Sequence, residues 1–377
     1  MSKIIKVPVN EPLLRGNERK YLIDCIRSNY ISSNGKYVNK FETQFAKEVR
    51  RDYAITVSNG TAALQIAFES LNIKKGSEVI LPAFTIISCI LPVIRAGSTP
   101  VLIDADPLTW NMKVEDIEKN ITKKTKAIIA SHIYGLPIDM DPLIYLAKKY
   151  KLKIIEDAAE VLGLKYKNRP CGSFGDLSTF SFYANKHITT GEGGMIVTND
   201  KKLADRCRSL RNLCFNNERR FLHYELGWNQ RLTNLQSAIG LAQLEKIKSF
   251  IKKKRKIGSY YQAELSVLKK YMHLPLEKKS YAKNIYWVFG IVLKKNINMS
   301  IKKLMFLLKK KGIETRNFFW PLHQQPILKK MGYFKNSKFK NSEYLSQNGL
   351  YLPTGISLNF KQQNYVIKVL KNIFLNK

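Results

Sequence analysis

The chain has 377 residues, of which 45% are hydrophobic and 11% aromatic, so it can build a packed core and is not a disordered polymer. Its formal net charge of +35 raises the question of nucleic-acid or membrane-surface binding. However, the basic residues are spread along the chain in runs such as 252–256, which are typical of solvated helix faces. We therefore expect no specific nucleic-acid partner, although a positive field favours a phosphate-bearing small substrate.

The cysteine spacing and the lengths of the apolar segments bear on whether the chain is a disulfide-rich, zinc-binding, secreted or membrane protein. The five cysteines form no CxxC pair, which argues against a disulfide framework and a structural zinc site, so we expect no metal. The first ten residues do not resemble a signal peptide, and the longest apolar stretch, 86–94, is too short to span a bilayer. We expect a soluble, cytoplasmic protein without membrane insertion.

The first half of the chain alternates between short β-branched runs and helical patterns. The runs are nearly continuous in apolar residues, which is typical of strands buried on both faces. Helical patterns lie between several of them, at 61–71 and at 141–150, where Asp141 and Pro142 supply a candidate N-cap and first position. The predicted strands are 53–57, 78–82, 99–104, 126–131, 152–157, 178–183 and 194–198. This alternation predicts an α/β fold with a mostly parallel sheet covered by helices.

The sequence pattern changes from about residue 235. Apolar spacing over 235–265 indicates one long helix or a helix pair, 285–293 indicates a strand, and 300–313 indicates a helix that stops at Gly312. We predict a large domain over residues 1–250 and a smaller α+β domain over residues 251–377.

A turn and a helix start follow the first predicted strand. Ser58, Asn59 and Gly60 form the turn, and Thr61 opens the helix. Backbone N–H groups at a helix start attract anions, Gly60 lets a phosphate approach closely, and Thr61 adds a hydroxyl. By itself the pattern is more often a capped helix without a ligand, and that alternative stays open.

Asp157 stands at the end of an apolar strand, where open parallel sheets place their ligands. A carboxylate at such a position needs a partner, and a protonated pyridine nitrogen is one candidate, since opposite charges keep each other ionised. The alternative is an N-cap of a following helix, and on this residue alone it is the simpler interpretation.

Lys186 lies between an aromatic strand and a glycine-rich turn, in "STFSFYANKHITTGEGG". A lysine that forms a Schiff base needs a carbonyl cofactor close by and a turn of small residues that admits it. Ser181 supplies a further hydroxyl for a phosphate. We expect His187 to point away from Lys186, toward solvent or an interface, if the segment is extended there.

Several segments together resemble one family, the pyridoxal-phosphate-dependent sugar-nucleotide aminotransferases of the DegT/DnrJ/EryC1/StrS group. The resemblance spans nearly the whole chain and implies the α/β fold type I architecture, with a mostly parallel mixed sheet and a smaller C-terminal domain. The segments that carry it are "EPLLRGNERKYL", "SNGTAAL", "EDAAE", "TFSFYANKHITTGEGGMIVT", "GWNQRLTNLQSAIGLAQL" and "ETRNFFWPLH".

The resemblance implies roles for individual residues around pyridoxal 5'-phosphate. Lys186 would hold the cofactor as a Schiff base and move the proton, and Asp157 would pair with the pyridine nitrogen. Glu160 would lie near the phenolic oxygen. Many family members stack an aromatic residue on the ring, but Ile86 occupies that position, so either its aliphatic face or another side chain packs the ring. The phosphate would be held by Gly60, Thr61 and Ser181.

The resemblance also implies a homodimer whose active site is shared between subunits. Asn229 would reach the cofactor phosphate of the neighbouring subunit. His323 would approach the sugar, and Arg231 and Arg316 would bind the substrate.

The implied reaction transfers the amino group of L-glutamate to C4 of a nucleotide-linked 4-keto-6-deoxyhexose, with a GDP-linked sugar as the first choice. UDP-linked and dTDP-linked sugars remain alternatives, as do action at C3, a desulfurase-like enzyme and a non-catalytic cofactor-binding or nucleic-acid-binding protein. Family members with histidine in place of the lysine are dehydratases, so Lys186 favours transamination. The "GEGG" turn disfavours the C3 subgroup.

Overall fold

The computed structural model describes residues 5–216 and 218–375, and its centre is a seven-stranded sheet with the order β1-β9-β8-β5-β4-β2-β3. All strands are parallel except β9, which runs antiparallel to both of its neighbours. The strands are β1 (Tyr53–Val57), β2 (Glu78–Pro82), β3 (Thr99–Ile103), β4 (Thr125–Ser131), β5 (Lys153–Asp157), β8 (Leu177–Ser181) and β9 (Gly194–Thr198). The seven predicted strands and the mostly parallel mixed α/β sheet are therefore confirmed.

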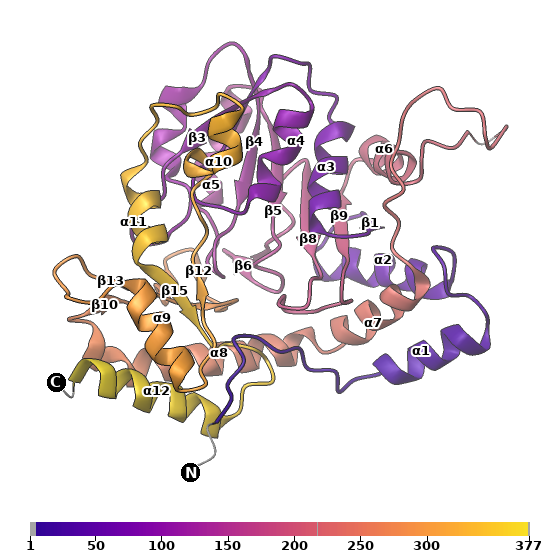
Figure 1. The fold of residues 1–377 in the computed structure, drawn as a ribbon. Helices are drawn as coiled ribbons and strands as arrows, with labels where there is room; N and C mark the ends of the chain where they lie inside the picture. Colours follow the sequence, from indigo (N-terminus) through magenta and orange to yellow (C-terminus); the bar gives the residue numbers. More distant parts are fainter. Residues whose placement is uncertain (1–4, 217, 376–377) are drawn as a thin grey trace.

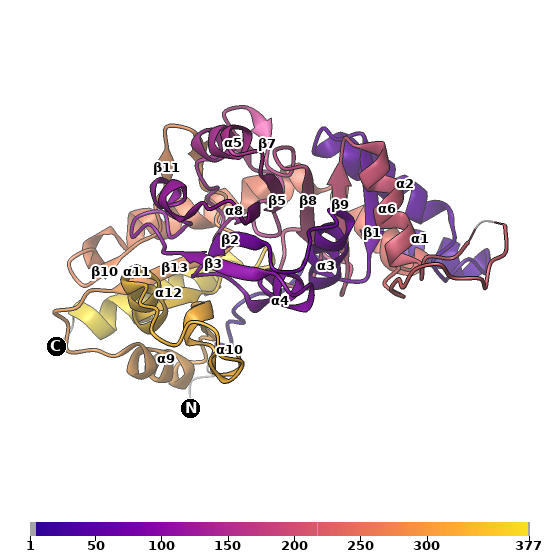
Figure 2. The same cartoon turned by 90° about the horizontal axis from the view of Figure 1, so that it is seen from above.

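Two helical layers cover this sheet (Figures 1 and 2). One face packs against α3 (Gly60–Ser70), α4 (Leu91–Arg95) and α6 (Lys201–Arg211). The other face packs against α2 (Lys36–Glu48), α5 (Met140–Lys149), α7 (Asn234–Leu244) and the first part of α8 (Ile247–Glu264). Successive residues of β9 face opposite helical layers. Ile196 packs toward α3, α4 and α6, whereas Met195 and Val197 pack toward α2, α5, α7 and α8. Burial on both faces explains the continuous apolar runs of these strands.

A second, antiparallel sheet with the order β10-β13-β15-β14 lies beside the large one. Its strands are β10 (Met272–His273), β13 (Phe289–Leu293), β14 (Arg316–Asn317) and β15 (Gly349–Leu352), and its apolar cluster includes α8, α9 (Ile301–Lys310) and α12 (Phe360–Leu375). The remaining helices and short strands are α1 (Glu18–Arg27), α10 (Pro326–Lys330), α11 (Lys340–Asn348), β6 (Lys165–Tyr166), β7 (Arg169–Pro170), β11 (Lys278–Lys279) and β12 (Ala282–Lys283).

Three local expectations differ from the structure. The segment 235–265 is a helix pair, α7 and α8, and the strand expected from residue 285 begins at Phe289, because Tyr286 adopts the left-handed conformation with φ 51°. Asp139, rather than Asp141, is the N-cap of α5. The expected domain boundary at residue 250 falls inside α8, and the division into two domains stays a prediction.

A buried lysine of helix α8 binds the segments that flank the small sheet. The Lys254 Nζ donates to the carbonyl oxygens of Trp287 and Thr354 at 2.7 and 2.6 Å. Burial lowers the pKa of Lys254 to about 7. These contacts fix the chain before β13 and after β15 against the helix. Among the described residues, none of the helices combines the length and the apolar character needed to cross a bilayer.

Candidate active site

The carboxyl ends of the parallel strands β1, β5 and β8 meet at one edge of the large sheet, and a cavity of about 570 Å³ opens there. The small sheet contributes Arg316 and Tyr351 to the wall, and Trp287 joins them from the segment just before β13. Of the eleven residues predicted for the site, the cavity brings together Gly60, Thr61, Ile86, Asp157, Glu160, Ser181, Lys186 and Arg316. This is the edge at which open α/β sheets bind ligands.

The first turn of α3 forms one end of the cavity. Asn59 is the N-cap, and its Oδ1 accepts the N–H of Ala62 at 2.8 Å. The N–H groups of Gly60 and Thr61 belong to the turn that has no acceptor inside the helix. A Cβ at Gly60 would lie 2.7 Å from the Cβ of Ser181, so only glycine lets these two elements approach so closely. The result is an anion-binding cradle lined by the Thr61 and Ser181 hydroxyls.

The Asp157 carboxylate lies at the end of β5 and is 5% exposed. Its Oδ2 accepts from the Ser131 Oγ at 3.1 Å and from the Cys89 Sγ at 3.3 Å, and its Oδ1 accepts from the Ala159 N–H at 3.2 Å. The chain continues as turns rather than a helix, so Asp157 is not the N-cap of a following helix. A buried carboxylate that faces a cavity is suited to bind a cationic or N–H group of a ligand.

Lys186 lies near the floor of the cavity between an acid and an aromatic ring. Its Nζ is 3.7 Å from the Glu160 Oε1 and 3.9 Å from the ring centroid of Trp287. The Trp287 Nε1 donates to the Asn185 carbonyl, which holds the indole beside the lysine. Burial raises the pKa of Glu160 to about 7, although the Lys186 charge and the Tyr134 N–H oppose that shift.

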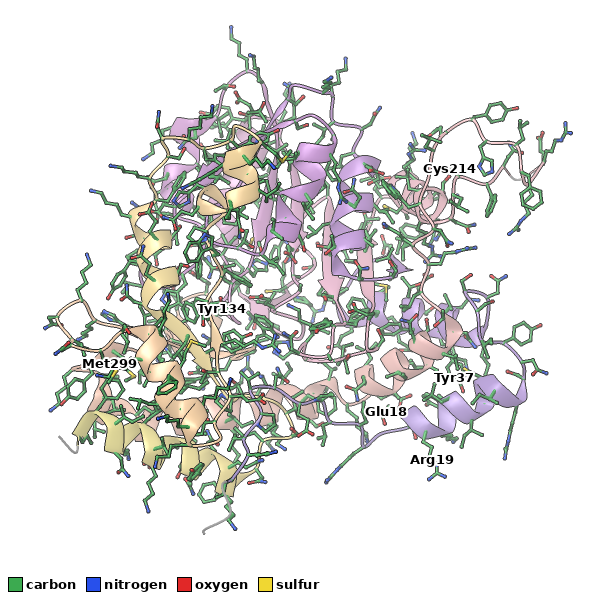
Figure 3. All side chains as sticks on the ribbon, in the orientation of Figure 1. Glu18, Arg19, Tyr37, Tyr134, Cys214 and Met299 are labelled. Atoms are coloured by element: carbon green, nitrogen blue, oxygen red, sulfur yellow. The ribbon has the colours of Figure 1, made fainter. Side chains whose placement is uncertain are left out.

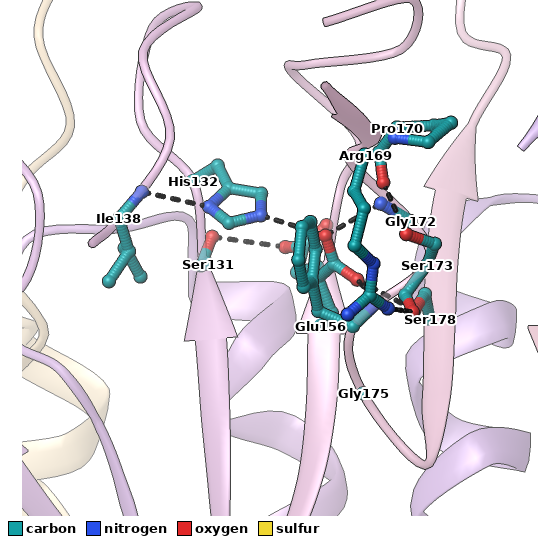
Figure 4. Close-up of polar contacts among 12 residues, drawn as sticks. Ser131, His132, Ile138, Glu156, Arg169, Pro170, Gly172, Ser173, Gly175 and Ser178 are labelled. Carbon is teal, nitrogen blue, oxygen red and sulfur yellow. Dashed lines mark hydrogen bonds and ion pairs between the residues drawn. The ribbon is translucent and has the colours of Figure 1, made fainter. Parts of the chain in front are cut away.

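A buried network lies behind the cavity, on the opposite face of β5 (Figure 4). The Glu156 Oε1 accepts from the His132 Nε2 and the Gly172 N–H, and its Oε2 accepts from the Phe174 N–H and the Ser178 Oγ. The His132 Nδ1 accepts the N–H of Ile138, so the ring proton is on Nε2. Burial alone would raise the pKa of Glu156, but these donors outweigh it and lower the pKa to about 2.

The Glu156 network also decides between a metal site and a structural role. Glu156, His132 and Cys171 lie close enough together to hold a metal ion. However, both carboxylate oxygens and both ring nitrogens already have hydrogen-bond partners within the protein. We interpret the cluster as a clamp that fixes the end of β5.

Three predicted residues do not line the cavity. The His323 side chain is 1% exposed, its Nε2 contacts the Glu343 Oε1 at 2.8 Å, and its ring packs on Phe339. Glu343 lies on α11, and the role of His323 toward the sugar stays a prediction. Asn229 and Arg231 contact each other, and their roles stay predictions.

The expectation that His187 faces solvent or an interface is wrong. The His187 side chain is 1% exposed, and neither ring nitrogen has a hydrogen-bond partner among the described residues. The reason is local, because residues 184–188 form turns and bends rather than an extended strand. Burial, together with the charges of Lys254 and Lys186, lowers the pKa of His187 well below its ordinary value.

Sequence reasoning missed several residues of the cavity wall, notably Trp287, Arg95 and Phe319, and gave no account of Glu192. Trp287 lies in an apolar run, "IYWVFGIVL", that indicates only a strand. A tryptophan within such an apolar, aromatic run gives no signal of its own. Its position depends on how the small sheet packs against the large one.

The residues present fit pyridoxal phosphate. The cradle at Gly60 matches a phosphate, the buried Asp157 matches a protonated pyridine nitrogen, and Lys186 lines the same cavity. A mixed sheet with this edge and this lysine defines a pyridoxal-phosphate-dependent aminotransferase of fold type I. Residues 12–371 match the DegT/DnrJ/EryC1/StrS aminotransferase family, and the chain belongs to it.

Three relatives illustrate the similarity. The chain is 42% identical to the GDP-perosamine synthase of Escherichia coli O157:H7 and 40% identical to that of Vibrio cholerae, and each match covers 98% of this chain and 99% of the relative. Among solved structures, it is similar to a histidine-to-asparagine mutant of GDP-4-keto-6-deoxymannose-3-dehydratase (ColD) with bound GDP-perosamine. That match has a TM-score of 0.89 and 27% identity, and it covers 97% of this chain and 100% of the other.

Proposed function

We propose that the protein transfers an amino group to C4 of a GDP-linked 4-keto-6-deoxyhexose and forms GDP-perosamine. Two nearly full-length relatives at 40% and 42% identity carry the name GDP-perosamine synthase, and a structure of the same fold binds GDP-perosamine. The observation that carries transamination is Lys186 itself, whose amine lies in the cavity near Glu160 and Trp287. A lysine amine there can hold a carbonyl cofactor covalently and then carry a proton, whereas the histidine of the dehydratases cannot form a Schiff base.

The side chains divide the chemical work as follows. Pyridoxal phosphate supplies the electron sink and carries the amino group between donor and acceptor. Asp157 keeps the pyridine nitrogen protonated, and the first turn of α3 with Ser181 holds the phosphate. Lys186 takes a proton from the donor Cα and later delivers one to the sugar C4. Glu160 lies beside Lys186 and orients its amine.

We propose L-glutamate as the amino donor, with Arg316 as the cation that binds a substrate carboxylate or phosphate. Arg316 lies on β14, is exposed, and lines the same cavity as Lys186. Donor and acceptor use the same cavity in turn, so the kinetics should be ping-pong.

The test is incubation with glutamate and a panel of GDP-, UDP- and dTDP-linked 4-keto-6-deoxy sugars, with product mass as the measurement. Amination of the GDP-linked sugar alone supports the proposal in full. Amination of a UDP- or dTDP-linked sugar instead would replace the substrate, and no amination of any 4-keto sugar would refute the reaction.

We also propose a homodimer with shared active sites. Residues 212–216 and 218–231 form an arm that projects beyond α6 (Figure 1), and Cys214 lies where the arm leaves the helix (Figure 3). Phe221, Tyr224 and Leu226 on this arm are 80%, 79% and 95% exposed, which is unusual for apolar side chains unless a partner covers them. Gln230 lines the cavity of its own chain, whereas neighbouring Asn229 does not, and this supports a role for Asn229 in a second subunit.

A mixing experiment tests the shared site. Lys186→Ala and Asn229→Ala, each inactive alone, are unfolded, mixed in equal amounts and refolded. If the sites are shared, half of the dimers are hybrids with one intact site, so about a quarter of the wild-type activity returns. No recovery in hybrids shown to form would refute a shared site.

We further propose a cytoplasmic location and use of the amino sugar in surface polysaccharide synthesis, such as that of O-antigen. A nucleotide sugar and glutamate as co-substrates support this location. Fractionation of producing cells, with the enzyme followed by immunoblot, tests it.

A further inference from the structure

Three buried polar side chains, those of Thr85, Cys89 and Ser131, form a hydrogen-bonded group with the buried Asp157 carboxylate. Thr85, Cys89, Ser131 and Asp157 are 1%, 0%, 4% and 5% exposed. The Thr85 hydroxyl donates to the Ser131 Oγ at 3.1 Å and lies 3.4 Å from the Cys89 Sγ. Ser131 and Cys89 both donate to the same oxygen of Asp157, its Oδ2.

The fold brings these residues together from three separate elements. Ser131 ends β4 and pairs directly with Asp157 at the end of β5. Cys89 lies in the short 3-10 helix Ile87–Cys89, which follows the end of β2. Thr85 precedes that helix and bridges it to β4. The carboxylate is therefore held from behind by side chains of its neighbouring strands and loop, and its exposed edge faces the cavity.

The chemical state of Cys89 follows from its surroundings. Burial, and then the nearby Asp157 charge, raise the pKa of the Cys89 thiol well above its ordinary value. The sulfur therefore keeps its proton and serves as a hydrogen-bond donor rather than a nucleophile. Its complete burial and its hydrogen bond to Asp157 also argue against Cys89 as the reactive cysteine of a desulfurase-like enzyme.

We infer that Cys89 and Ser131 are positioning residues that tune the Asp157 carboxylate toward the pyridine nitrogen of the cofactor. The inference rests on the proposed role of Asp157. Two donors on Oδ2 disperse its negative charge and fix the plane of the carboxylate. The carboxylate then attracts the ring proton less strongly, so the proton stays on the pyridine nitrogen and the ring remains a strong electron sink.

This tuning has a spectroscopic consequence that does not depend on turnover. The near-visible band of pyridoxal phosphate bound to Lys186 changes with pH as the nitrogen between them gains or loses a proton. A protonated ring withdraws electrons and makes that nitrogen less basic. Loss of a donor to Asp157 draws the ring proton toward the carboxylate, which weakens this withdrawal. The pH midpoint of the band should therefore rise.

The experiment is a spectral pH titration of the holoenzyme in five forms. Cys89→Ala and Ser131→Ala should each raise the pH midpoint by roughly half a unit, because each removes one hydrogen bond to the carboxylate. Cys89→Ser restores a donor and should return the midpoint toward the wild-type value. Cys207→Ala is the matched control, since Cys207 is equally buried but lies on α6, and its midpoint should not change.

The possible results distinguish a failure of the roles inferred for Cys89 and Ser131 from a failure of the role proposed for Asp157. A wild-type midpoint in both Cys89→Ala and Ser131→Ala overturns the inference, whatever the midpoint of Cys89→Ser. Equal shifts in Cys89→Ala and Cys89→Ser would indicate packing rather than hydrogen bonding and also overturn it. Asp157→Asn is titrated in parallel, and a shift there without shifts in the donor variants leaves the role of Asp157 intact. No shift in Asp157→Asn would refute that role as well.

Discussion

Glu160 makes the stability of the cofactor-free protein depend on pH in a defined window. Burial raises the pKa of its carboxyl from 4.5 to about 7 in the folded chain. Below pH 4.5 both folded and unfolded chains carry the proton, and above pH 7 neither does. Between these values the folded chain binds one proton more than the unfolded chain, so the free energy of unfolding falls as pH rises.

The magnitude follows from the same shift. At 1.36 kcal/mol per pKa unit, the raised pKa of Glu160 corresponds to about 3 kcal/mol of stability lost between pH 4.5 and pH 7. Glu160→Gln cannot ionise and should lack this contribution. The difference in unfolding free energy between wild type and variant should therefore change by about 3 kcal/mol across the window, with the wild type favoured at the acidic end.

Urea denaturation of the cofactor-free wild type and Glu160→Gln, at fixed protein concentration and at pH 4.5, 5.5, 6.5 and 7.5, measures this difference. Glu115→Gln serves as the control, because Glu115 is an exposed glutamate and its removal should leave the pH dependence unchanged. Parallel stability curves for wild type and Glu160→Gln would refute the reasoning that burial controls this carboxyl.

Three further predictions concern the lysine, the phosphate cradle and the buried clamp. Lys186→Ala should lower turnover by about 10³-fold and abolish the near-visible absorbance of the bound cofactor, because no other amine replaces the lysine. Steady-state kinetics and an absorption spectrum measure these effects, and retained activity would contradict the role of Lys186. Gly60→Ala should weaken pyridoxal phosphate binding roughly tenfold or more, because its Cβ would press on Ser181, and unchanged affinity in a fluorescence titration would rule out this close approach. Glu156→Gln should destabilise the protein by about 3 kcal/mol or more, because the amide N–H₂ group would face N–H and O–H groups that also donate. Urea denaturation measures this loss of stability, and an unaltered unfolding midpoint would show that the clamp is dispensable.

The central sheet could be predicted from sequence because its strands are buried on both faces. Continuous apolar runs such as 194–198 leave little choice of structure, and the predicted bounds agree with the observed strands to within two residues. The same logic singled out Gly60, Asp157 and Lys186, since each lies at the end of such a strand or within five residues after it.

The far wall of the cavity could not be predicted, because it depends on contacts between distant segments. Trp287 reaches Asn185 and Lys186 only because Lys254 and the small sheet place it there. His187 was misplaced for a related reason, because alternation of side chains holds only in an extended chain, and residues 184–188 turn.

The last two residues of β5, Glu156 and Asp157, are consecutive carboxylates whose side chains lie on opposite faces of the strand. Glu156 points to the clamp and Asp157 points to the cavity, so a slip of one residue in the pairing of β5 would exchange them. The clamp donors would then face the wrong side chain, and the cavity would lose its acid at the same moment. The clamp and the cofactor pocket therefore depend on the same register of β5. A sheet in which β5 is paired one residue out of register would lose both at once. Single-residue insertions or deletions within 153–157 should accordingly be far less tolerated than equal changes in an exposed loop of the same length.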